Sequence, residues 1–174
     1  IMFVHQDMWL GSDSWLENAE QSLRSLPDLG VAGVAGISVK GRNWLERCTR
    51  SIEDFSDWWE GHEPVHKPEE VQTLDECLLI VPRLIFEKLQ FDEKTFDGWD
   101  CYGSDYCLSG TQLGLKAYVI PGRCSHSCLR AAYHIWEFKD LLKYHKRLYA
   151  KHRARYRRIY TYAGDISWVN LRGR

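Results

Sequence analysis

Acidic and histidine side chains follow two apolar segments of this chain, at positions where chemistry is possible. His5, Gln6 and Asp7 come directly after the apolar run 1–4, and His126 follows a second β-type run at 116–121. A carboxylate at the end of a strand can hold Mg²⁺ or Mn²⁺, which take oxygen ligands and keep several waters. A neutral imidazole at the end of another strand can supply a second ligand to the same cation. The pattern predicts a divalent-cation site at Asp7 and His126; the alternative is two polar turns without a ligand.

Three further acids stand where a carboxylate needs a partner or a cleft. Asp105 lies near the start of a predicted helix at 105–113, where the helix dipole favours its ionised form; the alternative is an ordinary acid in a first helical turn. Asp75 and Glu76 fall inside the apolar run 71–81. Burying a charge without a partner costs roughly several kcal/mol or more. We therefore expect these two acids at the end of a strand, facing a cleft.

Apolar periodicity predicts the elements that must position these residues. A helix at 12–26 repeats its apolar residues at helical spacing, and Ser14 and Glu17 fit a capping box at its start. The predicted strands are 1–4, 31–39, 71–81 and 116–121, and the predicted helices are 12–26, 44–48, 82–89, 105–113 and 136–160. Strands alternating with helices indicate an α/β architecture with a mixed sheet flanked by helices.

A long excursion separates the second and third predicted strands. Residues 40–70 carry Trp44, Trp58 and Trp59 among many acids, with weak periodicity and one short predicted helix. Loops of this length are often lids or binding loops. Stacking on a sugar is one role for the tryptophans, and packing within the core or a lid is the other.

Composition and charge narrow the function classes. The chain has 174 residues and a net charge of −1, so one domain is expected and no global field recruits nucleic acid. The charge is uneven, because residues 139–158 hold nine Lys/Arg against Asp140 alone, which makes +8. That segment predicts either a solvated amphipathic helix or a peripheral contact with an anionic membrane.

The cysteines and the apolar runs bear on the compartment. The six cysteines show no zinc-ribbon or CxxC spacing. The set Cys124, His126 and Cys128 offers three closely spaced metal ligands, whereas a structural zinc site needs four. No apolar run approaches the roughly 20 residues that span a bilayer. We expect a cytoplasmic protein with reduced thiols, either free in the cytoplasm or peripheral at the inner face of the membrane.

Six segments in order carry a resemblance to a known family. They are residues 3–7, 33–36, 73–77, the stretch from 91–93 to 105–108, the stretch from 114–116 to Pro121, and 126–127. Together they look like the family-2-type glycosyltransferases of GT-A fold, closest to a branch whose metal triplet is His-Gln-Asp. The resemblance covers residues 1 to about 130. It predicts a glycosyltransferase-like domain at 1–130 and a C-terminal helical extension at 131–174.

The resemblance implies an activity. A nucleotide-diphosphate sugar would bind with Mn²⁺ or Mg²⁺ bridging its phosphates, and the sugar would pass with inversion to an acceptor hydroxyl on a glycan or a lipid-linked acceptor. Asp7 resembles the metal-ligating aspartate and His126 the later metal-site histidine, while His5 stands where a ribose contact is usual. Asp75 and Glu76 occupy the strand that borders the donor and acceptor sugars.

The catalytic base and its surroundings complete the implied site. In the common Glu-Asp-x-Asp-Leu form of the later motif, the base is the earlier aspartate, and that position falls on Gly103 here. Asp105 is therefore the nearest carboxylate predicted as base, with Asp100 in reserve, and Trp99 and Tyr102 flank it as predicted donor or acceptor contacts.

Two expectations qualify this activity. Because the chain begins inside an apolar strand, we expect a preceding nucleotide-binding portion of the fold. A non-catalytic module that binds carbohydrate or a partner on the same scaffold is the alternative function.

Overall fold

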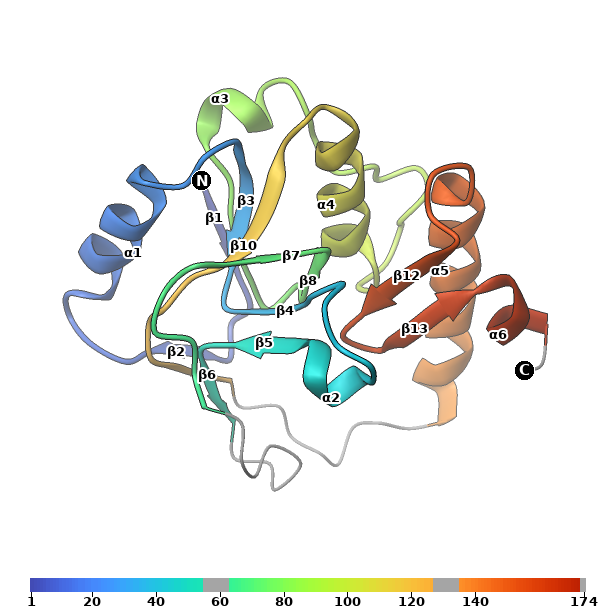
Figure 1. The fold of residues 1–174 in the computed structure, drawn as a ribbon, viewed down its shortest axis with the longest axis horizontal. Coiled ribbons are helices and arrows are strands. Elements are labelled where there is room, and N and C mark those ends of the chain that lie inside the picture. Colours follow the sequence, from blue (N-terminus) through green and yellow to red (C-terminus); the bar gives the residue numbers. More distant parts are fainter. Residues whose placement is uncertain (55–62, 127–134, 173–174) are drawn as a thin grey trace.

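A mixed five-stranded sheet runs through the protein (Figure 1), and the computed structural model describes residues 1–54, 63–126 and 135–172. β3 (Leu29–Gly33) and β10 (Lys116–Val119) pair in parallel at its centre. β9 (Leu78–Ile80) and then β1 (Met2–Val4) continue the sheet on one side in antiparallel fashion, and β7 (Glu69–Val71) closes the other side. The predicted mixed α/β sheet flanked by helices is confirmed.

Helices cover both faces of this sheet, and alternation along the strands explains how. In β3, Val31 packs in the core on one face and Ala32 in the core on the other, as the two-residue period of a strand requires. α1 (Trp15–Arg24) brings Trp15 and Ala19 to the second of these cores. α4 (Tyr102–Gln112) and the short α3 (Arg83–Phe86) pack against the first.

Two smaller sheets continue from one end of the large one. β2 (Met8–Leu10), β11 (Cys124–His126) and β6 (Ile52–Asp54) form the first. β5 (Cys48–Arg50), β4 (Ala35–Ile37) and β8 (Thr73–Leu74) form the second, with α2 (Trp44–Arg47) leading into it. Strands that leave the large sheet thus carry the chain toward the predicted site.

The C-terminal segment packs on α4 through a third apolar core. α5 (Ile135–His152), the hairpin of β12 (Arg158–Thr161) and β13 (Gly164–Ser167), and α6 (Trp168–Arg172) make it up. Tyr144 and Leu148 of α5 and Ile159 of β12 join Leu108 of α4 in this core. In Figure 1 α5 stands beside α4, on the side away from α1.

Two predicted strands are in fact pairs of strands. The run 31–39 divides into β3 and β4 around Val34, and the run 71–81 divides into β8 and β9 around a turn at 75–77. Close packing requires glycine at two positions of this region. A Cβ on Gly33 would lie 2.8 Å from Leu78 O, and one on Gly36 would lie 2.7 Å from Thr73 O. Only glycine lets these strands approach so closely.

Other element boundaries also differ from the predictions. The basic helix ends at His152 rather than near 160, because the buried Ile159 pairs in a strand. Ser14 is the N-cap of α1 but makes no capping hydrogen bond; instead the Asn18 amide donates to Ser14 Oγ at 3.3 Å. The capping box was therefore wrong. Among the described residues of 40–70, β5, β6 and the start of β7 accompany the expected short helix.

One of the three tryptophans of residues 40–70 lies among the described residues, and it packs against the C-terminal hairpin. Trp44 Nε1 donates to Thr161 O at 3.3 Å, and its ring meets the ring of Tyr162 edge-on at 5.8 Å between centroids. It packs α2 against the C-terminal hairpin. Trp58 and Trp59 lie outside the residues that the structure describes.

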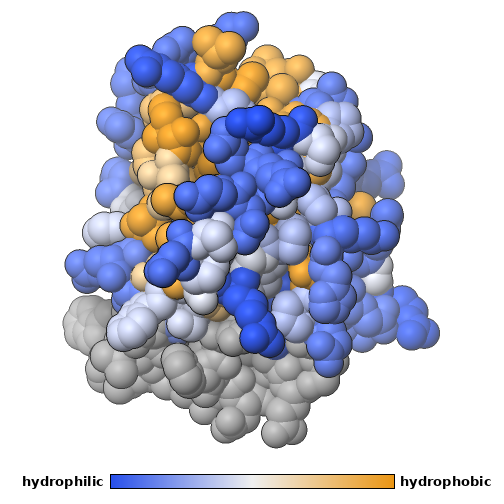
Figure 2. All heavy atoms as spheres, turned by 90° about the vertical axis from the view of Figure 1, so that its left-hand side faces the viewer, coloured by the Kyte–Doolittle hydropathy of each residue, from blue (hydrophilic) through white to orange (hydrophobic). Residues whose placement is uncertain are grey.

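Apolar side chains gather on part of the surface beside β1. Figure 2 shows orange residues in the upper half of the face that carries α1 and α3, with blue residues around them. Ile1, Met2 and Val4 are exposed along the edge strand, and Leu84 of α3 is 71% exposed. Among the described residues, no helix is both long and apolar enough to cross a membrane.

Candidate active site

A tight turn places the first predicted metal-binding residues at the end of β1. Met8 N donates to His5 O at 3.2 Å, which closes a turn over Gln6 and Asp7 and reverses the chain into β2. β2 then pairs with β11, and Met8 lies directly opposite His126. Strand pairing thereby brings the histidine next to Asp7, although the two are 119 residues apart.

The side chains of this turn and of β11 form a compact cluster. His126 Nε2 lies 3.1 Å from Asp7 Oδ1, and the rings of His5 and His126 lie 5.7 Å apart between centroids. The ligand atoms of His5, Asp7 and His126 all fall within 4.8 Å of one another. His5 Nε2 is buried and has no hydrogen-bond partner among the described residues. A buried imidazole nitrogen without a partner fits a metal ligand, since burial of an unpaired polar atom is otherwise unfavourable.

The turn between β8 and β9 borders this cluster. His5 N donates to Cys77 O at 2.9 Å, which ties the turn 75–77 to the end of β1. Asp75 Oδ1 accepts a hydrogen bond from Cys77 N at 3.0 Å and so holds the turn in shape. Both acids of the turn are half-buried, at a strand end as predicted rather than within a strand.

Glu76 reaches from this turn to the beginning of α4. Its Oε1 accepts hydrogen bonds from Gly103 N at 3.1 Å and Ser104 N at 3.4 Å, and Tyr102 Oη donates to its main-chain oxygen at 3.5 Å. Burial, followed by the charge of Asp75, raises the pKa of Glu76 to about 8 against the opposing pull of these main-chain donors. A carboxyl group with a pKa near neutrality is suited to accept or deliver a proton.

The residues just before α4 adopt an unusual backbone. Cys101 precedes the helix with φ 69°, in the left-handed region. For a residue other than glycine this costs roughly 1–2 kcal/mol, and such strain concentrates at functional sites. Trp99 is 82% exposed beside it, and Asp100 is half-buried. The strained entry aims the first main-chain N–H groups of α4 at Glu76.

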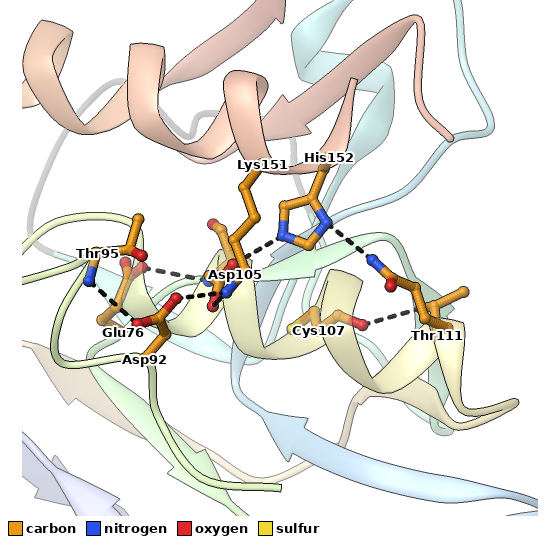
Figure 3. A network of polar contacts seen from close by, with 10 residues as sticks. Glu76, Asp92, Thr95, Asp105, Cys107, Thr111, Lys151 and His152 are labelled. Atoms are coloured by element: carbon orange, nitrogen blue, oxygen red, sulfur yellow. Dashed lines mark hydrogen bonds and ion pairs between the residues drawn. The ribbon is translucent and has the colours of Figure 1, made fainter. Parts of the chain in front are cut away.

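Asp105, one turn into α4, contacts α5. Figure 3 shows Lys151 and His152 reaching from α5 to the Asp105 carboxylate. His152 Nε2 lies 2.7 Å from Asp105 Oδ1 and Lys151 Nζ 2.9 Å from Oδ2, while the Asp105 side chain is 4% exposed. Both carboxylate oxygens are engaged, so this group fastens α5 to α4.

The surrounding contacts extend this network to the loop before α4. Gln112 Nε2 lies 3.1 Å from His152 Nδ1, which fits a neutral imidazole that accepts from the amide and donates through Nε2 to Asp105. Lys151 Nζ also donates to Asp92 Oδ2 at 2.8 Å, and this hydrogen bond is the main cause that lowers the pKa of Asp92. Hydrogen bonds from Arg147, and then from Tyr144, lower the pKa of Asp97 to about 2.

Comparison with known proteins decides the family. A family model described as "Glycosyltransferase like family" matches residues 1–152. The chain belongs to this glycosyltransferase-like family. A curated protein of Fuscovulum blasticum, described as "ATP synthase subunits region ORF 6", is 31% identical over 130 residues. The match covers 72% of this chain and 50% of that relative, so the chain spans about half the relative's length.

The predicted site residues of this glycosyltransferase-like chain do not all lie together. His5, Asp7 and His126 form one cluster, and the turn carrying Asp75 and Glu76 adjoins it. Glu76 in turn meets α4 near Tyr102. Asp105 lies in the separate network with α5, and Trp99 is on the surface.

Two features of the site were missed from the sequence. His5 was predicted as a donor or acceptor contact rather than as a third member of the candidate cation cluster, although its place directly after a strand, beside Asp7, was the available signal. The partners of Asp105, Lys151 and His152, gave no such signal, because they lie in a helix that was predicted only as basic.

Proposed function

We propose that this protein transfers a sugar from a nucleotide-diphosphate donor to an acceptor hydroxyl, with inversion and with a divalent cation. The observation that carries the proposal is the cluster of His5, Asp7 and His126, with its unpartnered His5 Nε2. Membership of the glycosyltransferase-like family supports glycosyl transfer in general. The cluster supports the cation, and the resemblance to family-2-type glycosyltransferases supports the inversion.

The residues of the cluster suit Mn²⁺ or Mg²⁺ bound together with a substrate diphosphate. Asp7 would supply a carboxylate oxygen and the two histidines would supply imidazole nitrogens, a mixed set of donors that favours Mn²⁺ over Mg²⁺. The cation would offset the negative charge that grows on the departing nucleoside diphosphate. Three ligands from the protein leave coordination positions for phosphate oxygens.

The acceptor would approach from the side of the turn 75–77. Asp75 and Glu76 stand there, and Tyr102 and the exposed Trp99 lie at the neighbouring entry to α4. An aromatic face and carboxylates are the groups that bind sugar rings and hydroxyls. A glycan or a lipid-linked sugar would be the acceptor, in the manner of polysaccharide biosynthesis.

A non-catalytic carbohydrate-binding module is the second candidate. The observation that favours it is the ion-paired state of Asp105, which leaves the carboxylate predicted as base occupied by Lys151 and His152. Such a module would bind sugar on the same scaffold without turning over a donor.

Calorimetry on the intact protein with Mn²⁺ and a panel of nucleoside diphosphates and nucleotide sugars tests the proposal. We expect binding of at least one nucleotide that requires the cation and is lost with EDTA. We also expect release of nucleoside diphosphate from a donor when simple glycoside acceptors are present. Nucleotide binding that ignores the cation, or no nucleotide binding at all, contradicts the proposed function. Cation-dependent binding without any transfer supports the binding module instead.

A further inference from the structure

We propose that Glu76, rather than Asp105, is the catalytic residue that takes the proton from the acceptor hydroxyl. This inference rests on the proposed function and names a residue for its chemical step. As the acceptor oxygen forms its bond to the anomeric carbon, its proton passes to a Glu76 carboxylate oxygen. The bond from that carbon to the donor diphosphate breaks, and its electron pair leaves with the nucleoside diphosphate.

The position of the carboxylate is the first support. A Cβ on Gly103 would lie 3.1 Å from Glu76 Cγ and 3.3 Å from Glu76 Oε1. The Glu76 side chain therefore fills the space that a side chain at position 103 would enter. A carboxylate from the turn between β8 and β9 thus stands at the start of α4, where the main-chain donors of Gly103 and Ser104 hold its Oε1. The second oxygen, Oε2, takes no part in either bond.

The second support is that the turn carrying Glu76 is joined to the proposed cation cluster. Cys77, the next residue, accepts the main-chain hydrogen bond of His5. The proton acceptor and the proposed cation ligands therefore lie on adjoining turns, which is the arrangement a single displacement needs. Asp105, in contrast, has both oxygens engaged by α5.

The electrostatic surroundings are the third support. The titratable groups that act on Glu76 or feel its charge are Asp75 and Cys77 on its own turn, Cys101 just before α4, and Tyr102 and Cys107 on α4. None of them carries a positive charge, so none stabilises the ionised form of Glu76 as a counter-ion would. Its pKa, raised to about 8 mainly by burial, gives the carboxylate a strong affinity for the acceptor proton.

The test compares Glu76→Gln with the exposed control Glu93→Gln in the intact protein. Transfer by Glu76→Gln is expected to fall by about 10²- to 10⁴-fold, the usual contribution of a general base. Calorimetric affinity for the nucleotide with Mn²⁺ is expected to stay within about threefold, because the residue does not contact the cation cluster directly. In the wild type kcat should rise with pH through about 8, and this rise should disappear in Glu76→Gln.

Moving the carboxylate from one backbone position to the other is the sharper test. Glu76→Ala empties the space beside Gly103, and adding Gly103→Asp returns a carboxylate from α4. We expect transfer lost in Glu76→Ala to recover at least tenfold in the double variant, a rescue that a purely structural role would not produce. Should Glu76→Gln fail to fold by circular dichroism, this pair and Glu76→Asp carry the test.

The possible results separate the two proposals. Transfer by Glu76→Gln within threefold of wild type overturns the inference and leaves the proposed function standing. Parallel loss of nucleotide affinity in Glu76→Gln also overturns it, since the residue would then bind donor. Absence of cation-dependent nucleotide binding in the wild type overturns the proposed function and this inference with it.

Discussion

Two carboxylate–histidine pairs occur in this protein, and their surroundings differ. Asp7 and His126 are 3.1 Å apart and half-buried, beside the buried and unpartnered nitrogen of His5. Asp105 and His152 are 2.7 Å apart and almost completely buried, and Lys151 and Gln112 occupy their remaining atoms. The first pair retains capacity to bind a ligand, whereas the second is saturated by its own chain. Similar residue types therefore serve a site in one region and packing in the other.

Breaking the saturated pair should have the largest effect. Asp105→Asn removes the charge that compensates Lys151 and leaves partners of α5 unpaired, so we expect a loss of about 3 kcal/mol in unfolding free energy. Urea unfolding followed by circular dichroism measures it. Asp140→Asn, exposed on α5, is the control and should change little. A stability loss below about 0.5 kcal/mol would show that the pair does not hold α5, and that the two pairs are not different in kind.

Breaking the open pair should affect binding instead of stability. Asp7→Asn is expected to weaken nucleotide affinity in the presence of Mn²⁺ by about 100-fold, or about 2.7 kcal/mol, with the melting temperature nearly unchanged. Calorimetry and thermal melting give the two quantities, with the exposed Asp13→Asn as control. A large fall in melting temperature with unchanged affinity would reverse the roles assigned to the two pairs.

Acid should weaken the contact of Asp97 with α5, which is intact at neutral pH. The folded pKa of Asp97 is lowered to about 2, below the roughly 3.9 of an unfolded aspartate. Its contribution is therefore present above about pH 4 and is lost as the pH falls toward 2. Asp97→Asn should lower the melting temperature slightly at pH 6, and the difference from wild type should be much smaller at pH 2. A difference as large at pH 2 as at pH 6 would contradict this assignment.

The smallest expected effect concerns a peripheral membrane contact of 139–158. Lys143, Arg147 and Lys151 contact acids of the same chain, which reduces the charge that this segment offers to lipid. We therefore propose at most weak binding to vesicles of phosphatidylserine and phosphatidylcholine, reduced further by 0.5 M salt. Vesicle sedimentation measures it, and tight binding that salt does not weaken would contradict the expectation.

Much of the scaffold and half of the site were predictable because they depend on local patterns. The apolar runs at 1–4 and 116–121 correspond to β1 and β10, and Asp7 and His126, predicted after them as cation ligands, lie together in the structure. The strand breaks near Val34 and in the turn 75–77 were not predicted. Hydropathy is continuous across both, and only pairing with different neighbours divides the runs.

The surroundings of the two candidate bases, Asp105 and Glu76, were not predictable in the same way. From the sequence, Asp105 and Glu76 were both acids near apolar elements, and the first was named as base because of its place in the later motif. Which of them has both carboxylate oxygens engaged depends on what packs against α4. Lys151 and His152, 46 and 47 residues after Asp105, engage those of Asp105.

Sequence alone determined the family resemblance, the mixed α/β class, and the pairing of Asp7 with His126 as candidate ligands. These follow from short motifs and from alternation along single strands. Tertiary structure alone decided that His5 lies with Asp7 and His126, that Glu76 stands at Gly103, and that Asp105 is buried against α5. The physical reason is that the environment of a carboxylate is set by neighbours distant in the chain, and one-dimensional spacing does not specify those neighbours.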